Sequence, residues 1–230
     1  MRAVLFLLVV LLAAFAHACG DDDDSTPTPR GSGAIDGNAE QQLRALAGSW
    51  AEASARISYD LTNSAGAAEV IVFRQPTRIR IDHTLGDRFT SIVVRENEGY
   101  SCSGLSNSCA LVSAEEAAEA ATFVPYVTTL ADSESVNKII SGADSIEIVD
   151  SETIAGEEPT CVKATGTLGG IAGPTTFCFS EDGLLLAVKY EGTPAFDMTA
   201  NEIGEIEDSD FDPPLVVITV PPTASATATP

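Results

Sequence analysis

The chain has 230 residues, a length typical of one domain with terminal extensions. Acidic side chains dominate, with 34 Asp and Glu against 12 Lys and Arg, and the formal net charge is −22. The negative electrostatic field of such a protein repels polyanions, so we expect no nucleic-acid partner and no membrane contact through a basic patch. Membrane attachment through a buried acyl chain stays compatible with this charge.

Residues 1–18 have the pattern of a signal peptide. Arg2 precedes an apolar run that ends near Ala16 and is shorter than the roughly 20 residues of a membrane-spanning helix. The following Ala16-His17-Ala18-Cys19 resembles a bacterial lipobox, although Ala16 and His17 depart from the favoured residues. The resemblance implies that Cys19 is acylated and anchors the protein to a membrane. The alternative is an ordinary secretory cleavage site at the same bond.

Cysteine usage and composition agree with a location outside the cytoplasm. Without Cys19, four cysteines remain, an even number able to pair in an oxidising compartment. Residues 19–37 are rich in Asp, Pro, Gly and Ser and predict an acylated, disordered tether, and residues 221–230 predict a disordered Pro/Thr/Ala tail. We therefore expect a lipid-anchored protein on the extracytoplasmic face of a bacterial membrane, with one folded domain over residues 38–220.

The domain begins with a predicted helix over residues 39–53. Asn38 and Gln41 resemble a capping box, and apolar residues from Leu43 to Trp50 recur at helical spacing. From Arg56 onward the period changes to two, as expected for a half-buried antiparallel strand. Alternation and turn residues place further strands at residues 69–74, 78–83, 88–96, 100–103 and 109–112.

Two helices interrupt the strands. Ser113 to Glu116 form a capping box that opens an Ala-rich helix, which Pro125 ends or kinks. A second helix is predicted over residues 133–141. Strands then resume with Ile146 and Ile148 and continue at residues 161–167, 175–180, 184–190 and 196–203, with a last edge strand within 215–220.

The four remaining cysteines fit two hairpins. Opposed residues of an antiparallel hairpin have numbers of constant sum, and the pair Cys161 and Cys178 centres on the turn at Gly169 and Gly170. The pair Cys102 and Cys109 likewise centres on a loop rich in Gly, Ser and Asn. Directly opposed Cα atoms lie close enough for a disulfide, so we expect two structural staples rather than a zinc or redox site.

The sequence carries no convincing catalytic site. We therefore expect that the protein is not an enzyme and has no cofactor and no resident metal. Nucleophilic hydrolysis needs an activating base, and His83 is the single histidine beyond the signal segment. Ser135 and Lys138 spell a Ser-x-x-Lys motif without its partner motifs. The acids from Asp208 to Asp212 resemble a calcium loop but lack its glycine and its final Glu, which leaves weak calcium binding as an alternative.

The order of these parts resembles the LolA/LolB-like carriers and the LppX/LprG-like lipoproteins. Three stretches support the resemblance: Val72 to Ile81 with its strand, proline, arginine and strand; the turn Asp182-Gly183-Leu184-Leu185; and Asp210-Phe211-Asp212-Pro213-Pro214. The resemblance implies an α+β fold, a strongly curved antiparallel β half-barrel with an N-terminal helix and a helical lid insertion.

The same resemblance implies a non-catalytic function. A cavity between sheet and helices would hold acyl chains, so an acyl lipid is the expected ligand. The alternative is a structural, interaction or envelope-sensing module in which the sheet encloses a solid core. Hydrophobic pattern alone does not separate a cavity from a solid core.

Overall fold

The computed structural model describes residues 37–124, 126–168 and 171–218. Six helical segments and twelve strands make up this part of the chain. The helical segments are α1 (Gly37–Glu52), α2 (Ala114–Ala120), η1 (Ala121–Phe123), η2 (Thr129–Ala131) and α3 (Ser133–Ser141), with a further short turn, η3 (Asp208–Phe211), near the end. The strands are β1 (Ala55–Asn63), β2 (Gly66–Gln75), β3 (Arg78–Leu85), β4 (Arg88–Val94), β5 (Gly99–Ser103), β6 (Ser108–Val112), β7 (Ala143–Val149), β8 (Thr160–Leu168), β9 (Ile171–Phe179), β10 (Leu185–Tyr190), β11 (Phe196–Gly204) and β12 (Val216–Ile218).

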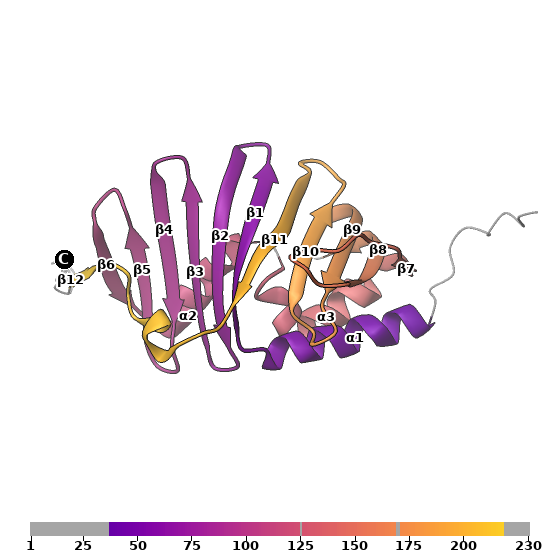
Figure 1. Cartoon of the computed structure of the whole chain (residues 1–230), viewed down its shortest axis with the longest axis horizontal. Helices are drawn as coiled ribbons and strands as arrows, with labels where there is room; N and C mark the ends of the chain where they lie inside the picture. The colour runs from indigo at the N-terminus through magenta and orange to yellow at the C-terminus, as the bar shows by residue number, and fades with distance from the viewer. Residues whose placement is uncertain (1–36, 125, 169–170, 219–230) are drawn as a thin grey trace, which may run out of the picture. The chain divides into compact units, whose positions relative to one another are not determined.

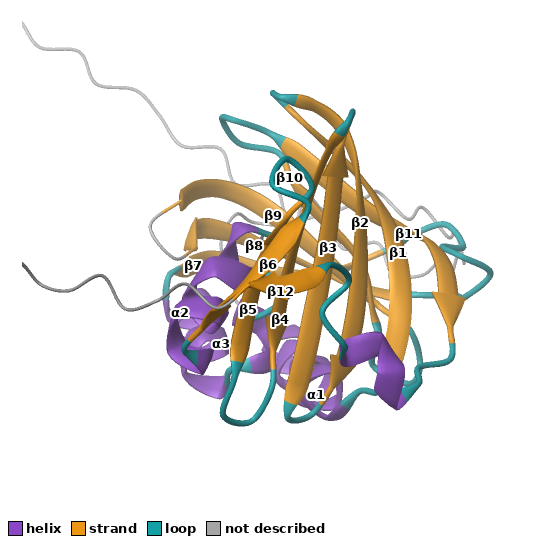
Figure 2. Cartoon of the chain, turned by 90° about the vertical axis from the view of Figure 1, so that its left-hand side faces the viewer, coloured by secondary structure: helices purple, strands orange, loops and turns teal. Residues whose placement is uncertain are grey.

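All twelve strands belong to one curved sheet (Figures 1 and 2). Its order is β12-β6-β5-β4-β3-β2-β1-β11-β10-β9-β8-β7. Two meanders, β1 to β6 and β7 to β11, are joined by the antiparallel pairing of β1 with β11. Only β12 runs parallel to its neighbour, β6. The predicted α+β class and curved antiparallel sheet are confirmed.

The helices lie against one face of the sheet, which we call the helix-covered face. On β1 this face carries Ile57, Tyr59 and Leu61, each at most 4% exposed, as the period of two predicted. The burial of α1 follows the helical period, and its buried residues are Ala39, Leu43, Ala47 and Trp50. This stripe packs against α3, η2, β7 and β8. The predicted N-terminal helix is therefore confirmed, with Asn38 inside its first turn rather than before it.

The Ala-rich helix α2 is part of the core rather than a loose lid. Its capping box forms as predicted, because the Ser113 hydroxyl accepts from the Glu116 amide while the Glu116 carboxylate accepts from the Ser113 amide. A Cβ placed on Gly99 of β5 would lie only 2.4 Å from the Cβ of Ala117. So close an approach leaves no room for a ligand between α2 and β5, and the predicted helical lid is not confirmed in α2.

Three arginines fix residues 208–212 to the other face of the sheet, the outer face. The guanidinium of Arg78 lies 4.4 Å from the ring centroid of Phe211, which is fully buried. Arg95 donates from Nε and Nη2 to the Phe211 carbonyl at 3.0 and 2.7 Å, and Arg80 donates to the Asp210 carbonyl at 3.0 Å. These contacts anchor η3 on the outer face before the chain continues to β12.

The acids of this segment pair with the same arginines. Asp208 lies 2.6 Å from Arg78, and Asp212 lies 2.6 Å from Arg95. The alternating carboxylates that suggested a calcium loop thus serve two ion pairs. Among the described residues there is no cluster of three or more His, Cys, Asp or Glu side chains able to hold a metal ion.

Two disulfides staple the two hairpins. Cys102 faces Cys109 across β5 and β6 with Cα atoms 3.9 Å apart, and Cys161 faces Cys178 across β8 and β9 at 4.1 Å. Both pairs lie in the register that the constant-sum argument used. In the described part of the chain, no helix has the length and apolar character needed to cross a membrane.

Candidate functional site

An apolar groove lies on the helix-covered face at the end of the strands where β1 turns into β2. The helices cross the opposite end of the strands in Figure 1. The groove has a volume of about 370 Å³, within the range of roughly 300–1,000 Å³ common for ligand pockets. It is lined by Leu61, Asn63, Ser64, Ala65, Ala68, His83, Leu85, Pro194, Ala195 and Phe196. None of these lining residues is an acid, a lysine or an arginine, although the protein is strongly acidic.

The alternation of three neighbouring strands builds this groove. Leu61 of β1 faces Ala68 of β2 and lies on the same side of the sheet as the buried Tyr59. His83 of β3 pairs with Val70 of β2, so it also points to the helix-covered face. The loop between β10 and β11 and the first residue of β11, Phe196, supply the opposite wall.

His83 is the titratable side chain of the groove. Its ring is half-buried, and burial lowers its pKa below the usual 6.5 because the charged imidazolium loses solvation. At neutral pH the ring is therefore uncharged, which suits an apolar groove. The sequence pattern alone assigned His83 no functional role, and the structure places it in the groove wall.

Aromatic rings fill the space behind Phe196. The ring of Tyr126 lies 6.2 Å from that of Phe196 in a stacked arrangement and 5.1 Å from that of Phe177 edge to face. Tyr190 lies 5.7 Å from Phe196 on the other side. Tyr126 also has a φ of +66°, a left-handed conformation that is strained for a bulky residue and is concentrated at functional positions. Phe196 thus separates the groove from a close-packed aromatic cluster.

The segment that carries Tyr126 covers the middle of the helix-covered face. We call residues 121–132, of which residue 125 is not described, the covering segment. Its side chains Val124, Val127 and Leu130 are at most 1% exposed and pack into the core. Trp50 of α1 donates its indole N–H to the Val127 carbonyl at 2.8 Å, which ties this segment to the first helix.

A buried arginine holds Trp50 in place. Arg74 of β2 donates from Nε to the Trp50 carbonyl at 2.8 Å and from Nη2 to the Ala51 carbonyl at 2.9 Å. Its guanidinium lies 4.8 Å from the Trp50 ring centroid, in a cation–π contact. Burial lowers the pKa of Arg74 to about 10, so the side chain stays charged at neutral pH. Arg74 therefore caps the end of α1.

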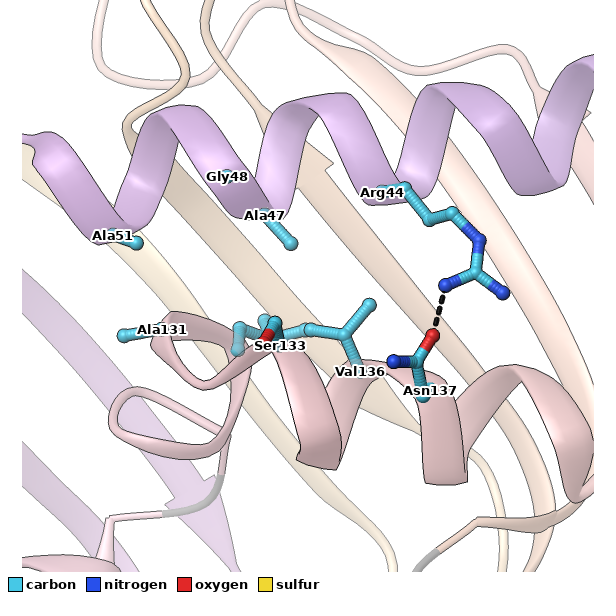
Figure 3. Close-up of a pocket in the computed structure, with 9 residues that line it drawn as sticks. Arg44, Ala47, Gly48, Ala51, Ala131, Ser133, Val136 and Asn137 are labelled. Carbon is cyan, nitrogen blue, oxygen red and sulfur yellow. Dashed lines mark hydrogen bonds between the residues drawn. The ribbon is translucent and has the colours of Figure 1, made fainter.

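A smaller hollow of about 160 Å³ lies between α1 and α3 (Figure 3). The small residues Ala47, Gly48 and Ala51 of α1 face Val136 of α3 across it. A hydrogen bond from Arg44 to the Asn137 side chain lies at one end. This hollow has less than half the volume of the apolar groove. Larger hollows beside the β7–β8 loop are lined with carboxylates and do not suit an apolar ligand.

The sequence located the strands that build the groove but not the groove itself. Pro194 of the β10–β11 loop and Phe196, the first residue of β11, lie more than 100 residues from Leu61, and nothing in the local pattern signals that they meet. Cys19, the predicted acylation site, lies outside the described residues. The two disulfides lie on strand pairs away from the groove lining.

No protein-family model and no curated protein sequence matches the chain. Among solved structures, MucB aligns with a TM-score of 0.58 at 10% identity, over 80% of this chain and 67% of its own. MucB of Pseudomonas aeruginosa in complex with MucA aligns with a TM-score of 0.54 at 10% identity, over 80% of this chain and 64% of its own. The chain spans about two thirds of the length of MucB.

The matched structures also include LppX, a lipoprotein of Mycobacterium tuberculosis. It aligns with a TM-score of 0.44 at 14% identity, over 74% of this chain and 96% of its own. LppX is one of the proteins that the sequence motifs resemble, and it is among the structures that match this chain. At identities of 10 to 14%, these matches show a similar fold and do not show the function of this chain.

Proposed function

We propose that the protein is a membrane-anchored extracytoplasmic lipoprotein that binds the acyl chain of a lipid or lipidated molecule in the apolar groove, without catalysing a reaction. One observation carries this proposal. A groove of about 370 Å³ in a protein of net charge −22 is lined by aliphatic, aromatic and small side chains and by no acid, lysine or arginine.

The chemistry of the lining matches an acyl chain. An apolar ligand gains free energy in proportion to the apolar area it removes from water, and Leu61, Leu85 and Phe196 supply such area. The polar residues Asn63 and Ser64 lie at the β1–β2 turn, where they would meet a head group. The lining offers no lysine or arginine, so binding would rest on the apolar chain of the ligand rather than on an ion pair with its head group.

A longer chain would require the covering segment to move. In the described structure Val124, Val127 and Leu130 occupy the space that a deeper cavity would need. The aromatic cluster around Tyr126 lies directly behind the groove wall at Phe196. We therefore assign the predicted role of lid to the covering segment rather than to α2, with Tyr126 as the side chain that swings away from Phe196.

Three separate features support this proposed location. The two disulfides favour an oxidising compartment, the signal segment predicts export, and Cys19 in a lipobox-like context predicts acylation. Residues 19–37 would hold the domain clear of the membrane surface as a tether. An anchored domain of this kind can receive an acyl chain from the bilayer or from another envelope protein.

The test is a titration of the chain from residue 20 onward, without its anchor, with a fluorescent fatty acid. Ala68→Trp places an indole in the groove and should weaken binding at least tenfold. Ala67→Trp is the matched control, because Ala67 is exposed and its side chain alternates to the outer face. No binding by the unsubstituted chain, or equal weakening by both variants, would contradict the proposal.

A second candidate function is a protein-interaction module. Two observations favour it: the helix-covered face is filled by the protein's own side chains, and MucB, which shares the fold, is found in complex with MucA. In this case the hollow between α1 and α3 would receive a side chain of the partner (Figure 3). Loss of partner binding in Ala47→Trp, with unchanged fatty-acid binding, would favour this candidate.

A further inference from the structure

Exposed apolar side chains gather at one edge of the sheet. Six large apolar residues of the described chain are strongly exposed, and five of them belong to β6, β12 and the β5–β6 turn. They are Leu105, Leu111, Val216, Val217 and Ile218, with exposures from 42% to 83%. Figure 2 views the molecule from this side, with β12 and β6 in front. Exposed apolar side chains gathered at one edge of a sheet favour an interaction site.

The same edge carries no charge. Residues 99–113 and 213–218 contain no Asp, Glu, Lys or Arg, although one residue in five of the whole chain is charged. These two ranges comprise β5, β6 and β12 with the turn between β5 and β6. We call this part of the molecule the uncharged edge.

The two edges of the sheet differ in how they are protected. Edge strands present unpaired backbone groups, and proteins usually guard them with charged side chains. The edge strand β7 follows this rule with Asp144 and Glu147. The edge strand β12 has no charged side chain, and among the described residues it pairs on one side only, with β6. Its other side offers backbone donors and acceptors to a further strand.

We propose that β12 pairs with β12 of a second copy of this chain, so that two sheets join across a two-fold axis. The net charge of −22 favours a second copy over a basic protein as the partner at this edge. A basic protein would be drawn to the acidic surfaces that cover the rest of the molecule, whereas a second copy is equally acidic and is repelled there. At the uncharged edge the two copies meet without opposed carboxylates. Antiparallel pairing of a strand with itself is also self-complementary, as a two-fold interface requires.

The pairing is centred on Val217, the middle residue of β12. With three residues in each strand, the interface is small and the dimer is weak in solution. Anchoring both copies to one membrane raises their effective concentration, so the dimer forms more readily there. Because the remaining surfaces repel, added salt strengthens the dimer, which is the opposite of what an interface built on ion pairs would do.

Sedimentation velocity of the chain from residue 20 onward tests this at about 5 to 500 µM, a range that covers weak interfaces. The dimer fraction should rise with concentration and with salt. Val217→Lys should abolish the dimer, because two lysines would oppose each other at the two-fold axis. Ile148→Lys is the matched control on the other edge strand, where Ile148 is 44% exposed, and it should leave the dimer unchanged.

A second measurement covers the case in which Val217→Lys disturbs the fold. Val217→Cys should form an intermolecular disulfide, because directly opposed Cα atoms in an antiparallel pair lie about 4.5 to 5.5 Å apart. Ile148→Cys should not. A monomer at all concentrations, a dimer that survives Val217→Lys, or vesicle flotation that depends on Val217 without any dimer would each overturn the proposal.

Discussion

The indole N–H of Trp50 donates to the carbonyl of Val127 at 2.8 Å, a contact between the first helix and a segment 77 residues further along the chain. Both residues are fully buried. The bond therefore holds the covering segment over the sheet in a place that water does not reach. Because this bond joins α1 to the covering segment, breaking it would make it easier for the covering segment to move and open the space behind the apolar groove.

Trp50→Phe keeps an aromatic ring and removes the N–H donor. The buried Val127 carbonyl then loses its partner, at a cost of about 1–3 kcal/mol. We expect faster amide hydrogen exchange in residues 126–131 and stronger binding of long-chain fatty acids, because opening the covering segment becomes easier. Unchanged exchange in this segment, in a variant that is otherwise folded, would show that the bond does not control its opening.

Arg74→Met should destabilise the whole domain. The substitution leaves the Trp50 and Ala51 carbonyls at the end of α1 without a donor and removes the cation–π contact, and we expect a loss of about 2–4 kcal/mol in the free energy of unfolding. Urea denaturation measures this loss. Arg88→Met, at an exposed position beginning β4, is the control and should change stability by less than about 0.5 kcal/mol.

The lowered pKa of His83 predicts a pH dependence of known sign. The unfolded chain binds a proton near pH 6.5, whereas the folded chain binds it at lower pH, so this contribution to stability is present above pH 6.5 and is lost as the pH falls through the folded pKa. A protonated His83 also places a charge in the apolar groove, so fatty-acid binding should weaken from pH 7 to pH 5.

The control for this prediction is His83→Gln, which does not titrate. Acidic side chains elsewhere also respond to pH, so the informative quantity is the difference between the two proteins at each pH. That difference should appear only below about pH 7, both in unfolding free energy and in fatty-acid affinity. Parallel pH profiles for the two proteins would rule out a role of His83 in the groove.

Cys19→Ala should move the protein from the membrane fraction to the soluble extracytoplasmic fraction. The reason is that the predicted acyl anchor is attached to the Cys19 thiol, which the variant lacks. Cell fractionation followed by immunoblotting measures the change. Membrane association that persists in the variant would show that the anchor was wrongly assigned.

Local sequence pattern predicted most of the elements because each has its own period. The alternation in β1 and the helical spacing in α1 both reflect one buried face, and the turn residues between the strands mark their ends. The pairing of β1 with β11 was not predicted, because nothing near Ile57 in the sequence indicates which distant strand lies beside it. The groove depends on that pairing, since it brings Phe196 next to Leu61, and so it was missed as well.

The arginine motif shows a second reason why sites escape a sequence reading. Arg74, Arg78 and Arg80 belong to the stretch that resembles the lipoprotein carriers, and strand alternation assigns no ligand role to Arg78 or Arg80. In the structure Arg74 caps α1, and Arg78 packs on Phe211 of η3 on the outer face of the sheet. Both roles depend on segments distant in sequence, so only the three-dimensional structure reveals them.

The most direct test of the central claim is photo-crosslinking with a fatty acid that carries a diazirine on its chain, followed by peptide mass spectrometry. If the apolar groove holds the acyl chain, the label should be found on peptides that contain Leu61, Ala68, Leu85 or Phe196, and Ala68→Trp should remove it. Label confined to the hollow between α1 and α3 or to the uncharged edge, or no specific label at all, would contradict the account.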